Sequence, residues 1–200
     1  MSEFRPLAGS PTRPAPTIDD VPDSFRIAID ELRSAQPRPE AVVEEVLAPS
    51  TLAPYAVALK AEIADHAATG RFILLHDPDG QESWGGTFRV VIYIRAELDS
   101  EMGDDPLLAS VAWTWLSDSL AQHGVQHTYA GGTATRILSE SFGSLESRSA
   151  SNDVELRASW TPDGSSFGAH LEAWADMVCS FAGLPPLPDG VVALPHIRRS

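Results

Sequence analysis

GGTFRVVIYIR, residues 85–95, is the longest run of strand-forming residues in the chain and decides the fold. β-Branched and aromatic residues dominate it, and these are the residues enriched in strands. Successive side chains of a strand point to opposite faces. One face is apolar and should lie at the centre of the core, whereas the other combines cations with a tyrosine. The two sets are Phe88, Val90, Ile92 and Ile94, and Arg89, Val91, Tyr93 and Arg95.

Apolar residues recur with helical spacing in four other segments, and we predict a helix in each. Pro22 suits the first turn of the first helix, because the amide that proline lacks has no partner there, and Asp20 can cap that turn. Gly70 and Gly183 are expected to end the second and fourth helices. The predicted helices cover residues 22–34, 52–66, 105–124 and 166–182.

Strand patterns occupy further segments of the chain. Residues 152–160 alternate between apolar and polar side chains, and a strand is also expected within 131–142. The turn signal at 77–80, Asp-Pro-Asp-Gly, predicts a hairpin between a strand at 71–76 and the central strand. Residues 41–47 fit a short strand or a helical turn, and we favour the strand.

These elements predict an α+β fold, in which an antiparallel sheet of four or five strands carries helices mainly on one face. A hairpin followed by a helix occurs twice, which indicates either an internal duplication or two independent ββα units, a common arrangement. We expect a single domain over residues 21–184. A disordered proline-rich arm is expected over 1–20 and an extended proline-rich tail over 185–200.

Composition limits the classes of function. The net charge is −14, from 28 acidic and 14 basic residues, so direct binding of nucleic acid is disfavoured. Cys179 is the only cysteine, which excludes an intrachain disulfide and favours the cytoplasm. We find neither a signal peptide nor an apolar run long enough for a membrane span. Lys60 is the only lysine beside many arginines, which is typical of a GC-rich genome.

No residue pattern predicts a metal site. Asp77 and Asp79 resemble a fragment of a calcium loop, but Glu82 follows too early to complete it. His123 and His127 have a spacing that suits a metal on a helix, yet Gly124 between them should end that helix. We therefore expect a turn at the aspartates and ordinary histidines at the helix end.

Catalytic and cofactor motifs are equally weak. The glycine pairs at 85–86 and 131–132 precede strands and do not match a phosphate-binding loop. His170 lies on an apolar helix face, as a core histidine or a catalytic base. Cys179 lies on the same helix and is expected in the core. We expect no catalytic residue, no cofactor and no metal.

The second face of the central strand carries the strongest indication of function. Arg89, Tyr93 and Arg95 share one register, and Arg157 is expected on the same outer face. Arg136 joins them only if its strand has the matching parity, which the sequence leaves open. Arginine and tyrosine suit planar, anionic or protein partners and are enriched at interface hot spots. The alternative is an ordinary solvent-facing surface with cross-strand ion pairs.

Four blocks of sequence resemble an actinobacterial family known as domain of unknown function 3000. They are LAPYAVAL (52–59), GGTFRVVIYIRAE (85–97), AGGTATRILSESFG (130–143) and ELRASWTP (155–162). The resemblance covers most of the chain, from about Pro22 to Arg198. It implies no activity, cofactor or catalytic residue, because none is established for the family.

From these observations we expect a cytoplasmic, non-catalytic binding or adaptor protein that uses the outer sheet face. Its partner is an unknown protein or a second copy of the chain. One alternative is an enzyme that acts on a small anionic substrate, with arginines converging on His170 or His127 in a deep pocket. The other is a structural homodimer that buries the arginine face in a symmetric interface.

Overall fold

A computed structural model describes residues 21–63, 68–98, 107–147 and 150–184. Within this part of the chain six strands form one antiparallel sheet with the order β1-β2-β3-β4-β6-β5. The strands are β1 (Val42–Val46), β2 (Tyr55–Glu62), β3 (Ala68–Gln81), β4 (Gly86–Leu98), β5 (His127–Ser139) and β6 (Ser151–Pro162). The helices are α1 (Asp23–Ser34), α3 (Leu108–Gln122), α4 (Phe167–Phe181) and the short 3-10 helix η3 (Gly143–Leu145).

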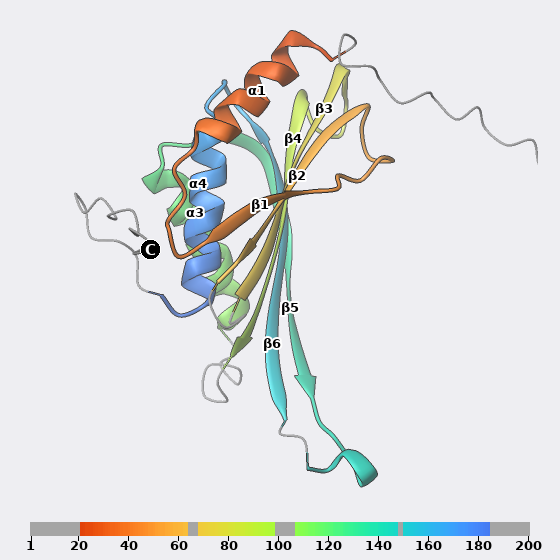
Figure 1. The fold of residues 1–200 in the computed structure, drawn as a ribbon, viewed down its shortest axis with the longest axis vertical. Coiled ribbons are helices and arrows are strands. Elements are labelled where there is room, and N and C mark those ends of the chain that lie inside the picture. Colours follow the sequence, from red (N-terminus) through yellow and green to blue (C-terminus); the bar gives the residue numbers. More distant parts are fainter. Residues whose placement is uncertain (1–20, 64–67, 99–106, 148–149, 185–200) are drawn as a thin grey trace, which may run out of the picture.

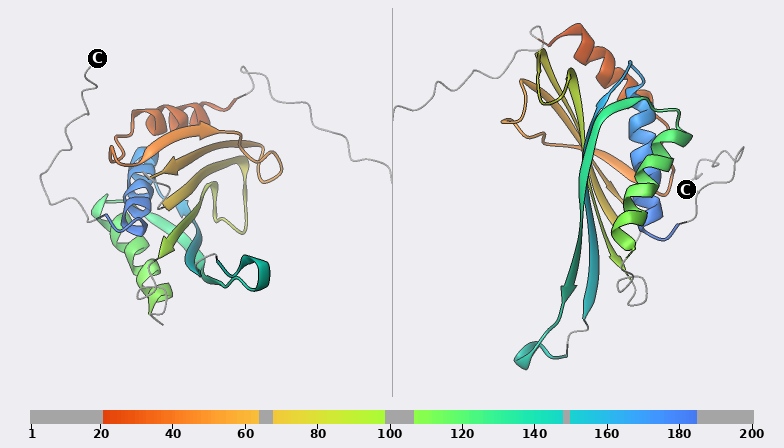
Figure 2. Two further views of the ribbon diagram at one scale, coloured as in Figure 1. Left: turned by 60° about the horizontal axis from the view of Figure 1, so that its bottom comes forward. Right: turned by 180° about the vertical axis from the view of Figure 1, so that it is seen from behind.

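The helices α1, α3 and α4 lie on one side of the twisted sheet, and the described residues place no helix on the other side (Figures 1 and 2). α4 packs between α1 and α3 and crosses strands β3 and β4. The long hairpin of β5 and β6 extends beyond the other strands (Figure 1). The α+β class and the predicted one-sided placement of the helices are therefore confirmed.

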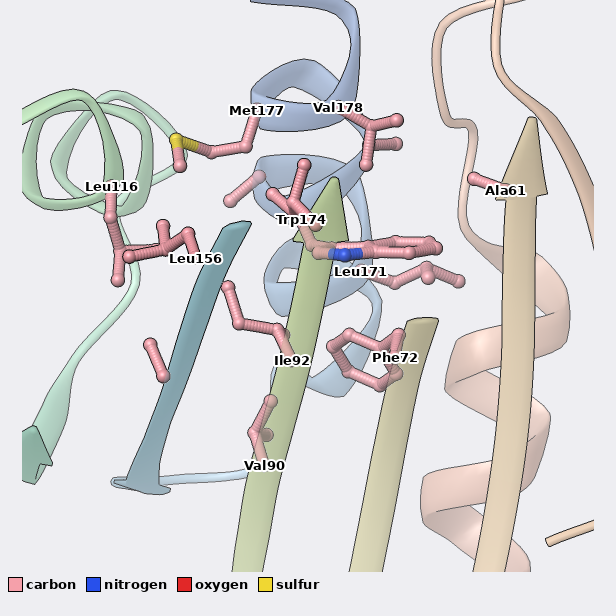
Figure 3. Close-up of a cluster of buried hydrophobic side chains, with 14 of the residues drawn as sticks. Ala61, Phe72, Val90, Ile92, Leu116, Leu156, Leu171, Trp174, Met177 and Val178 are labelled. Carbon is pink, nitrogen blue, oxygen red and sulfur yellow. The ribbon is translucent and has the colours of Figure 1, made fainter. Parts of the chain in front are cut away.

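The core lies between α4 and the middle of the sheet. Figure 3 shows Trp174 of α4 above Phe72, with Ile92 of the central strand beside them. Trp174, Phe72 and Ile92 are all buried. The predicted apolar face of the central strand is confirmed, because Val90, Ile92 and Ile94 face the helices and are at most 1% exposed.

The helix predicted over 52–66 is wrong, because Tyr55–Glu62 forms strand β2 between β1 and β3. Its apolar residues face the core with the strand period of two, so Val57 and Ala61 are buried beside Tyr55 and Leu59. Since β2 joins the sheet and residues 41–47 form β1, as we favoured, the sheet has six strands rather than four or five.

The turn predicted at 77–80 is also misplaced. β3 continues through these residues to Gln81, and the hairpin turn follows at 82–85. The register between β3 and β4 shifts between His76 and Gln81, and Gly80 has a φ of 72°. The Asp-Pro-Asp-Gly sequence therefore forms an irregularity inside a long strand. Gly70 lies within β3 and ends no helix.

The remaining predicted elements are confirmed within a few residues of their ends. They are the helices at α1, α3 and α4 and the strands at β1, β4, β5 and β6. The predicted cap at Asp20, the arm over 1–20 and the tail over 185–200 lie outside the described residues. The internal duplication stays a prediction.

Candidate functional site on the outer sheet face

The outer face of β4 and β6 brings together four of the five predicted binding residues. The antiparallel register places Tyr93 opposite Arg157 and Arg95 opposite Glu155. Arg89 lies further along β4 on the same face, because side chains two residues apart share a face. These residues and their polar neighbours form what we call the outer-face network: Arg89, Tyr93, Arg95, Asp153, Glu155, Arg157, Ser159 and Thr161.

Glu155 is the centre of one half of this network. Its Oε1 accepts a hydrogen bond from the Tyr93 hydroxyl at 2.8 Å, and its Oε2 accepts one from Arg157 Nη2 at 3.0 Å. The Arg157 guanidinium carbon also lies 5.5 Å from the centre of the Tyr93 ring, a cation–π distance. Burial, together with the bond to Glu155, raises the pKa of Tyr93. The tyrosine is therefore a neutral donor at neutral pH.

Arg95 forms a forked ion pair with Asp153. Its Nη2 lies 3.1 Å from Asp153 Oδ2 and its Nε lies 3.4 Å from Oδ1. The bond to Asp153 raises the pKa of Arg95. The carboxylate is largely covered while the guanidinium is about half exposed. The pair thus fixes the direction of an arginine that solvent can still reach.

Arg89 ties three strands together. Its Nη1 donates to the Tyr129 carbonyl of β5 at 3.0 Å and to the Thr161 hydroxyl of β6 at 3.1 Å. Its Nη2 donates to the Ser159 hydroxyl at 2.8 Å. Tyr129 has a φ of 52° and lies at the register shift of β5, so Arg89 holds an irregular backbone against the sheet. Burial lowers the pKa of Arg89, which has no carboxylate among these three partners.

We expect different stability losses from two alanine substitutions in this network. Arg89→Ala should lower the free energy of unfolding by about 2 kcal/mol, because it leaves three acceptors without their charged donor. Arg95→Ala removes an ion pair at the surface and should cost no more than about 1 kcal/mol. Urea unfolding of both variants measures the difference. Equal losses would show that Arg89 is not a structural clamp.

Arg136 does not join the outer-face network. It pairs with Val154, which is buried on the helix-covered side, so Arg136 points to that side of β5. It lines a pocket of about 260 Å³ near the start of α3, together with Leu108. The sequence left open which face of β5 carries Arg136. The structure places it on the helix-covered face, whereas the binding hypothesis required the outer face.

The histidines lie apart from the arginines. His170 of α4 is buried and accepts a hydrogen bond from the Trp160 indole Nε1 at 2.9 Å. Burial lowers the pKa of His170 to about 4, and neighbouring His127 contributes to the shift. The His127 ring lies edge-on to Trp160, 6.3 Å between ring centres. Within the described residues His170 and His127 thus lie on the helix side of the sheet and do not converge with the arginines of the outer face.

His123 joins α3 to α4. Its Nε2 lies 2.8 Å from Asp176 Oδ2, and its Nδ1 lies 3.7 Å from Glu172 Oε2. The bond to Asp176 raises the pKa of His123. No group of three or more possible metal ligands occurs in the part of the chain that the structure describes. None of the described helices is long and apolar enough to cross a membrane.

Sequence reasoning missed one histidine, His76 of β3. Its Nδ1 donates to the Thr87 carbonyl at 2.9 Å, so its Nε2 accepts from the Ser24 hydroxyl at 3.1 Å. A serine hydroxyl that donates a hydrogen bond to an oriented imidazole resembles a nucleophile with its general base. The ring, however, is 2% exposed and stacks on Phe25 and Phe88, so we assign it a structural role. The sequence could have indicated this position, because His76 lies two and four residues after Leu74 and Phe72 and therefore on the same, core-facing side of the strand.

The fold and the network define a two-layer α+β protein with one helix-covered and one open sheet face. The chain belongs to the DUF3000 family, described as a protein of unknown function, whose model matches residues 21–192. The resemblance found in the sequence is thereby confirmed. Comparisons with curated proteins and with solved structures gave no match.

Proposed function

We propose that this protein is a non-catalytic binding module that contacts a protein partner through the outer face of β4 and β6. The observation that supports the proposal is the outer-face network, which is already ordered by bonds within the chain. Ordering long side chains on binding costs about 0.5–1.5 kcal/mol each, and a surface ordered in advance avoids much of that cost.

Arg157 has the free donors that a partner would use. Its side chain is 68% exposed, and the one hydrogen bond found for it within the described residues uses Nη2. A guanidinium carries five N–H donors in a planar fork that matches a carboxylate. Arg157 therefore offers a directed site for an acidic or carbonyl group of a protein partner, with Tyr93 stacked beneath it.

The outer face of β4 and β6 is locally less acidic than the chain as a whole. Arg89, Arg95 and Arg157 equal in number the three carboxylates on this face, Asp153, Glu155 and Glu97, whereas the whole chain carries a net charge of −14. An acidic partner segment is therefore repelled less by this face than by the rest of the surface. The same overall charge disfavours nucleic acid as the partner. The single cysteine, Cys179, favours a reducing compartment, the cytoplasm, as the place of binding.

A matched pair of double variants tests the proposal. Arg95→Ala with Arg157→Ala removes two exposed arginines from the outer face. Arg26→Ala with Arg33→Ala removes two arginines that form exposed ion pairs on α1. The change in charge is the same, so a nonspecific charge effect cannot separate the two variants.

The measurement is affinity purification from the native cell, followed by binding of the recovered partner in pure form. We expect the outer-face variant to lose at least tenfold in affinity for that partner, and the α1 variant to bind as the wild type does. If both variants bind the partner equally well, the outer face is not part of the interface. Melting curves of both variants establish that each is folded.

A further inference from the structure

The two edges of the sheet differ in how they are protected. β1 has only five residues and carries Glu44 and Glu45, and Glu44 pairs with Lys60 at 3.1 Å. β5 has 13 residues, and Arg136 is the only residue in it that carries a formal charge. Short strands and charges are the usual protection of an edge against pairing with another chain. β1 has this protection and β5 largely lacks it.

The β5 edge is also exposed and projects from the body of the protein (Figures 1 and 2). Ten of its residues are exposed, from Thr128 to Ser139 with Ala134 and Ile137 half-buried. Large apolar side chains follow this edge and its tip: Tyr129 is 62% exposed, Leu138 64% and Phe142 76%. Such a surface is characteristic of strands that pair with another strand.

We propose that β5 pairs antiparallel with β5 of a second copy of this chain. The regular part of β5 runs from Gly131 to Ser139, because the register with β6 shifts between Thr128 and Gly131. Thr135 is the midpoint of this part. A two-fold axis at Thr135 pairs the whole regular part with itself, so that one sheet continues through both copies.

This register is complementary in side-chain size. It places Leu138 of the second copy opposite Gly132, and Ile137 of the second copy opposite Thr133. Gly132 has no room for a side chain of its own, because an added Cβ would lie 2.8 Å from Trp113 of α3. Leu138 of the second copy would therefore lie beside Trp113, which is partly exposed. The small residues at one end of β5 thus meet the large ones at the other.

The register also keeps the one charge of β5 out of direct opposition. Arg136 would lie opposite Ala134 of the second copy, so the two copies of Arg136 are diagonal neighbours and do not face each other directly. A partner of different sequence would not need small and large residues at opposite ends of the strand. This self-complementary pattern is the reason for choosing a second copy as the occupant of the edge.

Interface size and net charge set the expected strength of the dimer. Pairing of the regular part covers ~30 Å of strand on each copy, which places the buried area in the range of weak interfaces. Each copy carries a net charge of −14, so the two copies repel at long range. Added salt screens this repulsion, and the dimer should become tighter as the salt concentration rises.

Sedimentation of the full chain over a range of concentration and salt tests the pairing. We expect a dimer that dissociates in the micromolar range. Thr135→Lys places two like charges at the two-fold axis and should weaken the dimer at least tenfold. Val42→Lys adds the same charge at the opposite edge, where Val42 is 58% exposed, and should leave the dimer unchanged. A wild-type chain that stays monomeric in high salt, or equal weakening by both variants, would overturn the proposal.

Cysteine crosslinking tests the register independently. The only native cysteine, Cys179, is buried, so it contributes little background. Thr135→Cys, treated with oxidised glutathione, should give a disulfide-linked dimer, because residues at the axis lie within disulfide distance of each other. Val42→Cys should give none. Crosslinking at position 42 but not at 135 would contradict the β5 pairing.

The dimer does not depend on the proposed function. The variant Arg95→Ala with Arg157→Ala changes the sheet face and leaves the β5 edge intact, so it should dimerise as the wild type does. Loss of the dimer in this variant would contradict pairing at the edge and would place the interface on the face.

Discussion

Replacing Trp174 with alanine should lower the free energy of unfolding by about 3–5 kcal/mol, the range found when a large buried aromatic residue is truncated. Trp174 is fully buried, and its ring centre lies 5.7 Å from that of Phe72. Domains of this size are stable by about 5–15 kcal/mol, so the variant should be near the limit of folding.

The site of Trp174 is formed by a glycine, and this explains why the loss should be large. A Cβ added at Gly70 would lie 2.7 Å from Trp174 Cζ2 and 2.7 Å from Val178 Cγ2. The indole therefore rests directly on the backbone of β3. Because β3 is held by hydrogen bonds to β2 and β4, that backbone cannot move to fill the space that alanine would leave.

Two further variants make the measurement decisive. Trp174→Phe keeps an aromatic ring, and the indole Nε1 that it removes has no hydrogen-bond partner among the described residues. It should therefore cost less than half as much as alanine. Leu47→Ala changes a side chain that is 93% exposed and should cost less than about 0.5 kcal/mol. Urea unfolding gives all three values, and a loss below 1 kcal/mol for Trp174→Ala would refute this account of the core.

The strands that the sequence predicted best are those with a strong strand composition or an unambiguous period of two. The run of β-branched and aromatic residues in 86–95 and the alternation in 152–160 both favour a strand, and both strands are confirmed with their faces. The segment 52–66 is different, because Tyr55, Leu59 and Ile63 are four residues apart. A spacing of four places residues on one face of a helix and also on one face of a strand. Only the pairing of β2 with both neighbours distinguishes the two.

The sequence predicted which residues of β4 share the outer face, but it did not predict which residues of other strands they bond to. The alternation of β4 placed Arg89, Tyr93 and Arg95 together, which the structure confirms. The bonds that order them come from β6, and Tyr93 and Glu155 are 62 positions apart in the chain. No local pattern fixes the register between such distant strands. Arg136 shows the same limit, since the pairing of β5 with β6 decides which face it occupies.

Acidification from pH 6.5 to pH 4 should remove about 3 kcal/mol of stability through His170 alone. Burial and neighbouring His127 lower the pKa of His170 from an ordinary value of 6.5 to about 4. Between these two values the unfolded chain binds a proton at this position and the folded chain does not. Folding is therefore opposed more strongly as the pH falls, until the folded protein is protonated as well.

His170→Gln isolates this contribution from the general effect of acid. Glutamine keeps an acceptor for the Trp160 indole but does not titrate, so the stability of the variant should depend less on pH between 6.5 and 4 than that of the wild type. Urea unfolding at each pH gives both curves. Identical slopes would show that His170 is protonated in the folded protein.

His123 provides a control of opposite sign. The bond to Asp176 raises the pKa of His123, so its contribution is fully present below about pH 6.5 and is lost as the pH rises through the folded value. His123→Gln should therefore alter the pH dependence only above about pH 6.5, where the wild type gains stability from His123 as the pH falls and the variant does not. His170→Gln should alter it only between pH 6.5 and pH 4, where the variant loses less stability than the wild type. Both histidines lie at the packing contacts of α4, so general damage to this helix cannot produce changes of opposite sign in two separate pH ranges.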